Sequence, residues 1–239
     1  VLVEKAFMQT AAQAIEVAAA ARASGITTME AMWTRFLPRH DVVRQILDSG
    51  LLGEIETVSA YHGQYFAPDP NHRLYDPARA GGALLDLGVY PVSFTSFVLG
   101  TPGRITTRGT HAMTGVDRQM SAIFDEFDNP FAHAIVSTSL ASALPMRATV
   151  SGSEGRLELE TGWYGPGQVK VVMRDGSTGI STISESETTP TFSYQVAHFA
   201  RLIADGRVES DIISLDESVS IMQTMDQMRR QVGISYAGE

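Results

Sequence analysis

Residues 1–33 read VLVEKAFMQTAAQAIEVAAAARASGITTMEAMW, and this stretch decides the fold of the N-terminal part of the chain. Val1 to Phe7 is a short apolar segment typical of a buried strand, and Thr10 then opens a helix that ends at Gly25. Thr27 to Trp33 is again apolar and predicts a second strand. Strand, helix and strand within about thirty residues predict a right-handed βαβ unit, the building block of a parallel sheet.

A different pattern follows Pro38, which closes the βαβ unit of residues 1–37. Residues 38–239 contain a series of short strand-like stretches separated by turn residues, which favours a mostly antiparallel sheet. These stretches are Ile55 to Ala60, Arg104 to Met113, Gln119 to Phe127, His133 to Leu140, Met146 to Ser151, Arg156 to Glu160 and Val169 to Met173.

Helices accompany these strands. The sequence predicts one from Asp41 to Gly50 with Asp41 as its cap, one from about Ala83 to Leu99 after Gly81-Gly82, and two closing helices over Thr191 to Ala204 and Ser214 to Gln231. The polar stretch Ser177 to Thr189 is expected to be a mobile loop or a sheet edge. We therefore predict an α+β fold: a βαβ remnant, then one large, predominantly antiparallel open sheet with helices on one face.

Composition excludes several classes of function. The 239 residues carry a formal net charge of −9, and no run of Lys or Arg occurs, which argues against a nucleic-acid partner. The absence of cysteine excludes disulfides, a thiol nucleophile and cysteine-ligated metals, and a reducing cytoplasm is the default location. No apolar run is long enough to span a bilayer, so no membrane partner is expected.

Glu4-Lys5 stands at the predicted carboxyl end of a parallel strand, where α/β proteins bind their ligands. From that place a lysine can reach into a cleft. On position alone, a solvated lysine at a strand end explains the pattern as well.

The stretch from Gly81 to Pro91 reads GGALLDLGVYP and combines polar chemistry with an apolar helix. Asp86 and Tyr90 are four residues apart and therefore share one helix face. A carboxylate on so apolar a helix needs a partner, because burying it alone is costly. The alternative is that Asp86 caps a neighbouring loop and that Tyr90 is a core residue with its hydroxyl satisfied.

Together, Lys5, Asp86 and Tyr90 suggest a mechanism. A free tyrosine titrates near pH 10, and a neighbouring ammonium lowers that pKa. Tyr90 could then take a proton from a substrate hydroxyl while hydride leaves for a nicotinamide. Asp86 would orient Lys5 or bind a substrate hydroxyl.

Two further groups of residues complete the candidates. Trp33 and Arg35 follow the second strand, where an aromatic ring and a guanidinium suit a sugar or polyol, although packing between domains explains them too. Phe66 is a further candidate for substrate binding. The histidines, among them His62, His72, His111 and His133, lack metal-ligand spacing, so they are expected to be surface or structural residues and no metal is predicted.

Several of these motifs resemble those of the glucose-fructose oxidoreductase/inositol dehydrogenase (Gfo/Idh/MocA) family. Val1 to Ala6 resembles the family's strand that ends in Glu-Lys-Pro, with Ala6 in place of Pro. Asp86 to Tyr90 resembles its catalytic-helix motif, and Gly152 to Arg156 its Gly-Thr-Glu-Gly turn. Met29 to Pro38 is most like the branch of dimeric dihydrodiol dehydrogenase and NADP-dependent D-xylose dehydrogenase. Tyr194 to Phe199 and Leu215 to Arg230 resemble its closing helices.

The resemblance implies a function and a site. It implies an NAD(P)-dependent oxidoreductase acting on a sugar, a cyclic polyol or a trans-dihydrodiol, with Lys5 and Tyr90 as the catalytic pair and Asp86 beside them. Asp86, Tyr90 and Phe66 would bind substrate, and Glu4, Lys5, Trp33 and Arg35 would lie at the NADP or NAD cofactor. The alternatives are a non-catalytic sugar-binding or scaffold relative, or a chain that is inert without its cofactor fingerprint.

The resemblance also has implications for the domain organisation and the oligomeric state. Residues 1–37 would be the C-terminal remnant of a dinucleotide-binding Rossmann domain, and residues 38–239 the domain for substrate binding, catalysis and oligomerisation. The chain begins inside a predicted strand without Met, so we expect about ninety further residues upstream with Gly-x-Gly-x-x-Gly. The family pairs its open sheet face with another subunit, which implies a homodimer or higher oligomer.

Overall fold

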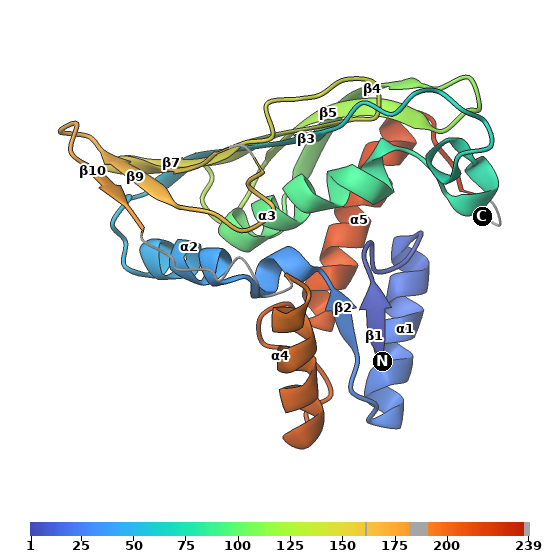
Figure 1. Cartoon of the computed structure of the whole chain (residues 1–239), viewed down its shortest axis with the longest axis horizontal. Helices are drawn as coiled ribbons and strands as arrows, with labels where there is room; N and C mark the ends of the chain where they lie inside the picture. Colours follow the sequence, from blue (N-terminus) through green and yellow to red (C-terminus); the bar gives the residue numbers. More distant parts are fainter. Residues whose placement is uncertain (161, 182–190, 237–239) are drawn as a thin grey trace.

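The computed structural model describes residues 1–160, 162–181 and 191–236. Its N-terminal part is the expected βαβ unit (Figure 1), made of strand β1 (Leu2–Glu4), helix α1 (Ala11–Ser24) and strand β2 (Met29–Ala31). β1 and β2 pair in parallel, with Val3 beside Glu30. The Thr10 hydroxyl caps α1, as predicted, by accepting a hydrogen bond from the backbone N–H of Gln13.

Eight strands form the second sheet, in the order β10-β9-β8-β7-β3-β6-β5-β4. Neighbouring strands are antiparallel except β3 and β6, which run parallel. The strands are β3 (Ile55–Gly63), β4 (Arg104–His111), β5 (Asp117–Asp125), β6 (His133–Ser139), β7 (Ala148–Gly152), β8 (Gly155–Leu159), β9 (Lys170–Met173) and β10 (Thr178–Ile180). The prediction of one large, mostly antiparallel sheet is confirmed.

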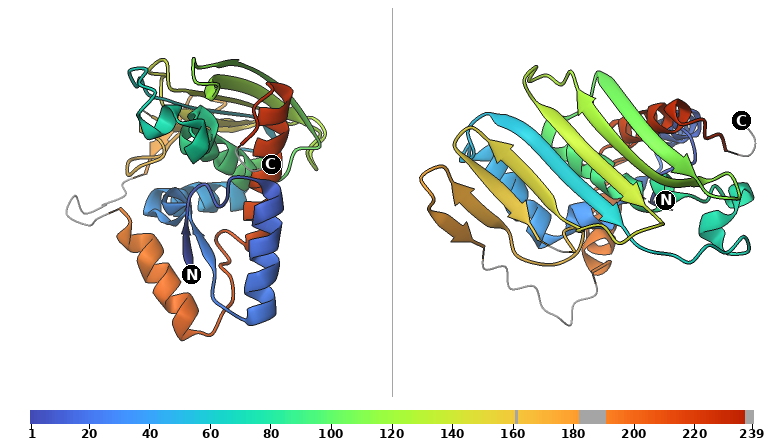
Figure 2. Two further views of the ribbon diagram at one scale, coloured as in Figure 1. Left: turned by 90° about the vertical axis from the view of Figure 1, so that its right-hand side faces the viewer. Right: turned by 90° about the horizontal axis from the view of Figure 1, so that it is seen from above.

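Helices cover one face of this sheet and leave the other face open (Figure 2). They are α2 (Pro38–Asp48), α3 (Val89–Leu99) and α5 (Leu215–Gln231). Inward-facing side chains of the strands, such as Val58 and Phe124, are fully buried in one apolar core with Phe94 of α3 and Met225 of α5. Burial of this apolar surface is the main force that holds the helices to the sheet.

Helix α5 joins the βαβ unit to the large sheet. Helix α4 (Ser193–Ala204) lies beside the βαβ unit, and α5 passes from that unit up to strand β4 (Figure 1). The Asp226 carboxylate of α5 accepts a hydrogen bond from the Ala11 N–H at the start of α1. The end of the chain therefore stabilises its beginning.

Local details differ from the sequence prediction. Helix α2 begins at Pro38, with Asp41 inside its first turn instead of at its cap, because proline suits the first helical position. Leu84–Gly88 is a π-helical turn, and regular α-helix begins only at Val89. Of the stretch Ser177 to Thr189, Thr178–Ile180 is the edge strand β10, whereas 182–189 lie outside the described residues.

In the described residues, one helical stretch, Pro77–Leu99, is long and apolar enough to cross a membrane by length and composition. This departs from the sequence prediction. Of its most apolar 18-residue window, however, 67% is buried inside the fold, which is the property of a core helix, and its apolar side chains pack against the sheet.

Candidate active site

Lys5 and Asp86 meet beside an open cleft of about 650 Å³. Lys5 follows β1 directly, and the peptide bond between Lys5 and Ala6 is cis. The Lys5 Nζ atom donates a hydrogen bond of 2.7 Å to the backbone oxygen of Asp86 and lies 3.5 Å from its carboxylate. The cleft is bounded by the turn after β1, by the start of α1 and by residues 73–86.

The Asp86 carboxylate bridges two cations. Its Oδ1 atom lies 3.0 Å from Nη1 of Arg73, in addition to its contact with Lys5. The side chain of Asp86 is only 17% exposed, so both partners help to offset the cost of burying its charge. The contact with Lys5 agrees with the predicted role of Asp86 in orienting that lysine. The contact with Arg73 agrees with the alternative, in which Asp86 binds a neighbouring loop.

Tyr90 projects from the first turn of α3 into a group of aromatic side chains. Its hydroxyl accepts a hydrogen bond of 3.0 Å from Nε1 of Trp33. The Lys5 Nζ atom lies 5.0 Å from the centroid of the Tyr90 ring. The structure thus brings Trp33, Lys5 and Tyr90 together from three separate segments, at the place where the two sheets of the fold approach each other.

The expected activation of Tyr90 by Lys5 is not what the structure shows. No direct hydrogen bond joins the Lys5 amine to the Tyr90 hydroxyl in the described part of the chain, because the amine is held by Asp86 and the hydroxyl by Trp33. Burial raises the pKa of Tyr90 to about 12, although the Trp33 hydrogen bond opposes that shift. Burial also lowers the pKa of Lys5, against the opposing effect of Asp86. Tyr90 is therefore a neutral phenol here and a weaker acid than a free tyrosine.

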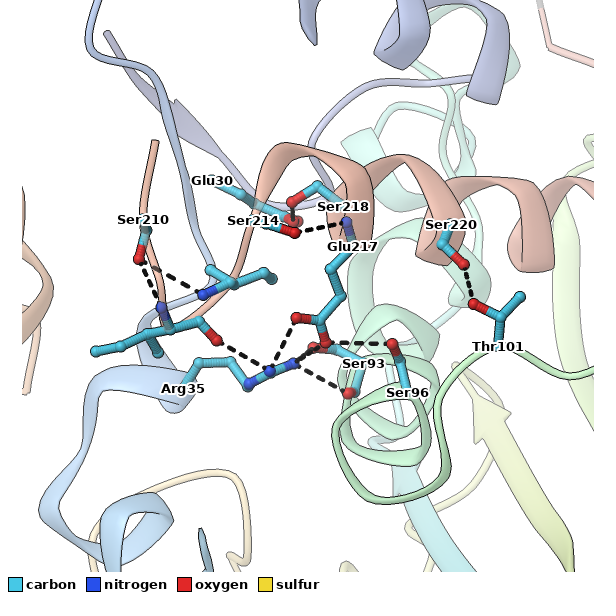
Figure 3. A network of polar contacts seen from close by, with 12 residues as sticks. Glu30, Arg35, Ser93, Ser96, Thr101, Ser210, Ser214, Glu217, Ser218 and Ser220 are labelled. Atoms are coloured by element: carbon cyan, nitrogen blue, oxygen red, sulfur yellow. Dashed lines mark hydrogen bonds and ion pairs between the residues drawn. The ribbon is translucent and has the colours of Figure 1, made fainter. Parts of the chain in front are cut away.

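Arg35 is placed differently from the prediction. Its guanidinium makes a two-pronged ion pair with Glu217 of α5, at 2.8 and 3.2 Å, and also donates to the backbone oxygen of Ser93 (Figure 3). Only 3% of its side chain is exposed. Trp33 and Arg35 lie in one short 3-10 turn, Trp33–Phe36, whose residues point to different sides. Arg35 therefore joins α3 to α5, which is the packing role considered as the alternative.

The two remaining candidates, Glu4 and Phe66, lie outside the lining of the cleft. Glu4 is exposed at the end of β1. Phe66 packs into a small second core cluster and stacks on His72, with 6.1 Å between ring centroids. Neither side chain lines the cleft.

The structure adds two aromatic residues that the sequence analysis did not select. The ring of His62, on β3, stacks on Tyr164 with 4.3 Å between centroids and lies 4.9 Å from Tyr90. Burial lowers the pKa of His62 to about 4, so this ring is neutral. No spacing rule links these residues, since they come from β3 and from the loop after β8. The alternation of β3, which turns His62 towards the helices, was the available signal.

The cleft is placed where a nicotinamide cofactor could bind. In residues 1–160, 162–181 and 191–236, no group of three His, Asp, Glu or Cys side chains could hold a metal ion. The cleft opens at the carboxyl end of parallel strand β1, where open α/β sheets bind dinucleotides. Lys5, which lines this cleft, would lie next to a nicotinamide bound there.

This fold and this site define a catalytic domain of the dehydrogenase and reductase class. Residues 40–158 match the model of the GFO/IDH/MocA C-terminal domain. The trans-1,2-dihydrobenzene-1,2-diol dehydrogenases of Homo sapiens and Bos taurus are 31% and 32% identical to this chain, over 99% of it and 71% of their own length. The chain belongs to the Gfo/Idh/MocA family of oxidoreductases.

Solved structures show the same fold. Aldose-aldose oxidoreductase from Caulobacter crescentus, complexed with glycerol, superposes with a TM-score of 0.83 at 22% identity, covering 96% of this chain and 69% of that one. KijD10, a 3-ketoreductase from Actinomadura kijaniata in complex with NADP and TDP-benzene, gives a TM-score of 0.83 at 24% identity, covering 96% and 70%.

Proposed function

We propose that this chain forms the substrate-binding and proton-transfer part of an NAD(P)-dependent dehydrogenase or reductase for a sugar, a cyclic polyol or a trans-dihydrodiol. The observation that carries the proposal is the contact of Lys5 with both Asp86 and the Tyr90 ring, at an open cleft that Lys5 and Asp86 line. The dihydrodiol dehydrogenases that match the whole chain support the substrate class.

The chemistry assigned to each residue follows from its surroundings. The nicotinamide, when bound, supplies or accepts the hydride. Tyr90 gives its proton to the substrate oxygen when a carbonyl is reduced, and takes it back when the alcohol is oxidised. Lys5, held by Asp86, places an amine beside the Tyr90 ring and stabilises negative charge that develops on the oxygen.

Aromatic rings favour a ring-shaped substrate. The rings of Trp33, Tyr164 and His62 contact the Tyr90 ring, edge to face for Trp33 and at a tilt for the other two. Such flat apolar faces bind the C–H face of a sugar or the ring of a dihydrodiol, while the few polar atoms fix its hydroxyl groups. Arg35 has no part in this proposal, because Glu217 engages it.

The cofactor is NADP or NAD, and we propose that most of its contacts come from residues outside this chain. No Gly-x-Gly-x-x-Gly turn occurs in the sequence, and β1 and β2 supply only part of a parallel dinucleotide-binding sheet. In this proposal residues 1–37 belong to the nucleotide-binding domain, and residues 38–239 form the catalytic domain. A location in the cytoplasm remains a prediction.

We further propose that the open face of the large sheet pairs with a second copy of the chain. Small and apolar side chains occur on that face, such as the cross-strand pair Ile123 and Ile135 and the hydrogen-bonded pair Ser121 and Ser137. The Ile123 side chain is 49% exposed in the single chain. A second sheet of the same kind would cover this surface in a two-fold dimer.

Fluorescence of Trp33 tests the proposed function. The full-length protein is titrated with NADPH and with NADH in a Trp163→Phe background, which leaves Trp33 as the only tryptophan of this chain. The proposal expects saturable quenching, followed by turnover with one member of a panel of aldoses, inositols and trans-dihydrodiols. Saturable cofactor binding without turnover across that panel would favour a non-catalytic relative.

A further inference from the structure

The helix that carries Asp86 and Tyr90 lacks a cap of its own. It begins with the π-helical turn Leu84–Gly88, and the preceding residue, Ala83, offers no side-chain acceptor for the first N–H groups. An acceptor is supplied by another element. The Oδ2 atom of Asp117, the first residue of β5, accepts a hydrogen bond of 2.6 Å from the Leu84 N–H.

Asp117 is buried at some cost. The residue is 1% exposed, and burial raises the pKa of its carboxyl to about 7. Its second oxygen, Oδ1, has no hydrogen-bond partner among the described residues. A buried carboxyl oxygen without a partner is unfavourable, and a serine or threonine could cap a helix with less desolvation.

The backbone before the turn is shaped around this carboxylate. Gly82 has a φ of 126°, and a Cβ atom added to it would lie 1.9 Å from Oδ1 of Asp117. Only glycine permits this approach and this backbone conformation. On the same turn, the Thr138 hydroxyl of β6 donates a hydrogen bond of 3.2 Å to the Ala83 carbonyl. Two neighbouring strands of the large sheet therefore hold the beginning of the helix.

The turn held in this way is the part of the helix that Lys5 touches. Lys5 donates to the backbone oxygen of Asp86, two residues after Leu84, and Tyr90 follows one helical turn later. A displacement of the turn would move the acceptor of Lys5 and the hydroxyl of Tyr90 together.

We propose that Asp117 is a positioning residue for the reaction: by accepting the Leu84 N–H, it fixes the turn on which Asp86 meets Lys5 and from which Tyr90 projects. The proposal rests on the proposed function, in that Lys5 and Tyr90 perform the chemistry. Asp117 itself, at the start of β5, acts on Lys5 and Tyr90 only through the turn that it holds.

Two substitutions separate positioning from plain stability. Asp117→Asn keeps an acceptor oxygen for the Leu84 N–H, whereas Asp117→Leu keeps the branching of the side chain and removes the acceptor. In the full-length protein, positioning predicts that Asp117→Leu lowers kcat by roughly tenfold or more with little change in KM, and that Asp117→Asn stays within about threefold. Ser214→Ala, which removes the cap of α5, is the matched control and leaves kcat unchanged.

A second readout needs no turnover. In the Trp163→Phe background, Trp33 emission reports the hydrogen bond to Tyr90. The emission maximum shifts in Asp117→Leu and stays in place in Asp117→Asn. If Asp117→Leu does not fold, Thr138→Val, which loosens the same turn, takes its place and shifts the emission in the same direction.

The outcomes are distinct. Unchanged kcat and unchanged Trp33 emission in the variant that loosens the turn would overturn the positioning role. A different result would be a shift of Trp33 emission with unchanged kcat, together with full activity of Tyr90→Phe. That result would show that Asp117 holds the turn in place, and it would reject the proposed function.

Discussion

The Lys5 amine donates its hydrogen bond to the backbone oxygen of Asp86, at 2.7 Å, and not to the hydroxyl of Tyr90. Lys5 is thereby tied to the turn Leu84–Gly88 that precedes α3, and its position depends on that turn. Tyr90 is a neutral phenol because burial raises its pKa to about 12, against the opposing effect of the hydrogen bond from Trp33.

Replacing Lys5 should impair both chemistry and cofactor binding. Lys5→Met removes the amine beside the Tyr90 ring and leaves the Asp86 carboxylate with Arg73 alone. We expect kcat to fall by roughly tenfold or more, the usual scale of such groups, and KM for the nicotinamide to rise. Lys170→Met, which breaks an ion pair with Glu158 on the large sheet, is the control and should keep its activity. Equal kinetics in the two variants would argue against a role for Lys5.

Arg35 should matter for stability and not for ligand affinity. Arg35→Met leaves Glu217, which also accepts a hydrogen bond from Ser96, without its charged partner, so we expect the free energy of unfolding to fall by about 3 kcal/mol. Adding Glu217→Gln should restore much of that loss. Urea unfolding with a cofactor titration of the remaining folded protein checks both points. A loss of cofactor affinity without a loss of stability would indicate that Arg35 contributes to cofactor binding.

Glu30 makes stability depend on pH. This carboxyl, on β2, accepts hydrogen bonds from the Phe7 N–H and the Ser218 hydroxyl, and burial raises its pKa from 4.5 to about 7. The folded state therefore holds the proton more tightly than the unfolded state. Stability is greatest below the unfolded pKa and falls as pH rises from about 4.5 to about 7, by at most roughly 3 kcal/mol.

The control for this prediction is Glu30→Gln, which keeps an acceptor and cannot ionise. Its urea midpoint should change less between pH 5 and pH 8 than that of the unaltered protein. Asp117, whose pKa is also raised, contributes a second slope of the same sign. If the urea midpoints of the two proteins changed with pH in the same way, Glu30 would not titrate in this range.

The open sheet face should carry the dimer contact. Ile123→Asp places a charge on that face, opposite Ile135, and should convert a dimer into a monomer. Light scattering at micromolar concentration measures the mass. Ile15→Asp, at a similarly exposed isoleucine on α1, serves as the control and should remain dimeric. A monomeric starting protein would contradict the proposed assembly.

Much of the fold could be predicted from local pattern. The capped helix between two apolar strands defined the βαβ unit, and alternation with turn residues defined the meandering strands. The π-helical turn at Leu84–Gly88 could not be predicted, because the Asp117 carboxylate and the Thr138 hydroxyl that hold it come from strands more than thirty residues away. Tertiary contacts decided the local geometry there.

The sequence indicated those candidate residues of the site that belong to a recognisable motif. Lys5, Asp86 and Trp33 gather near Tyr90, as their places at a strand end and on one helix face suggested. Arg35 was misplaced because a two-residue step around a 3-10 turn changes the direction of the side chain, which spacing alone does not show. The pKa of Tyr90 was misjudged because burial, which outweighs the hydrogen bond from Trp33, is not visible in the sequence.

The most direct test of the account is the turnover of Tyr90→Phe in the full-length protein. The substitution removes the proton-transferring hydroxyl and keeps the ring that packs against Trp33 and His62. We predict that kcat falls by roughly a hundredfold or more, that cofactor affinity changes little, and that the control Tyr194→Phe on α4 keeps its activity. Near-normal turnover in Tyr90→Phe would contradict the assignment of Tyr90 as the group that transfers the proton.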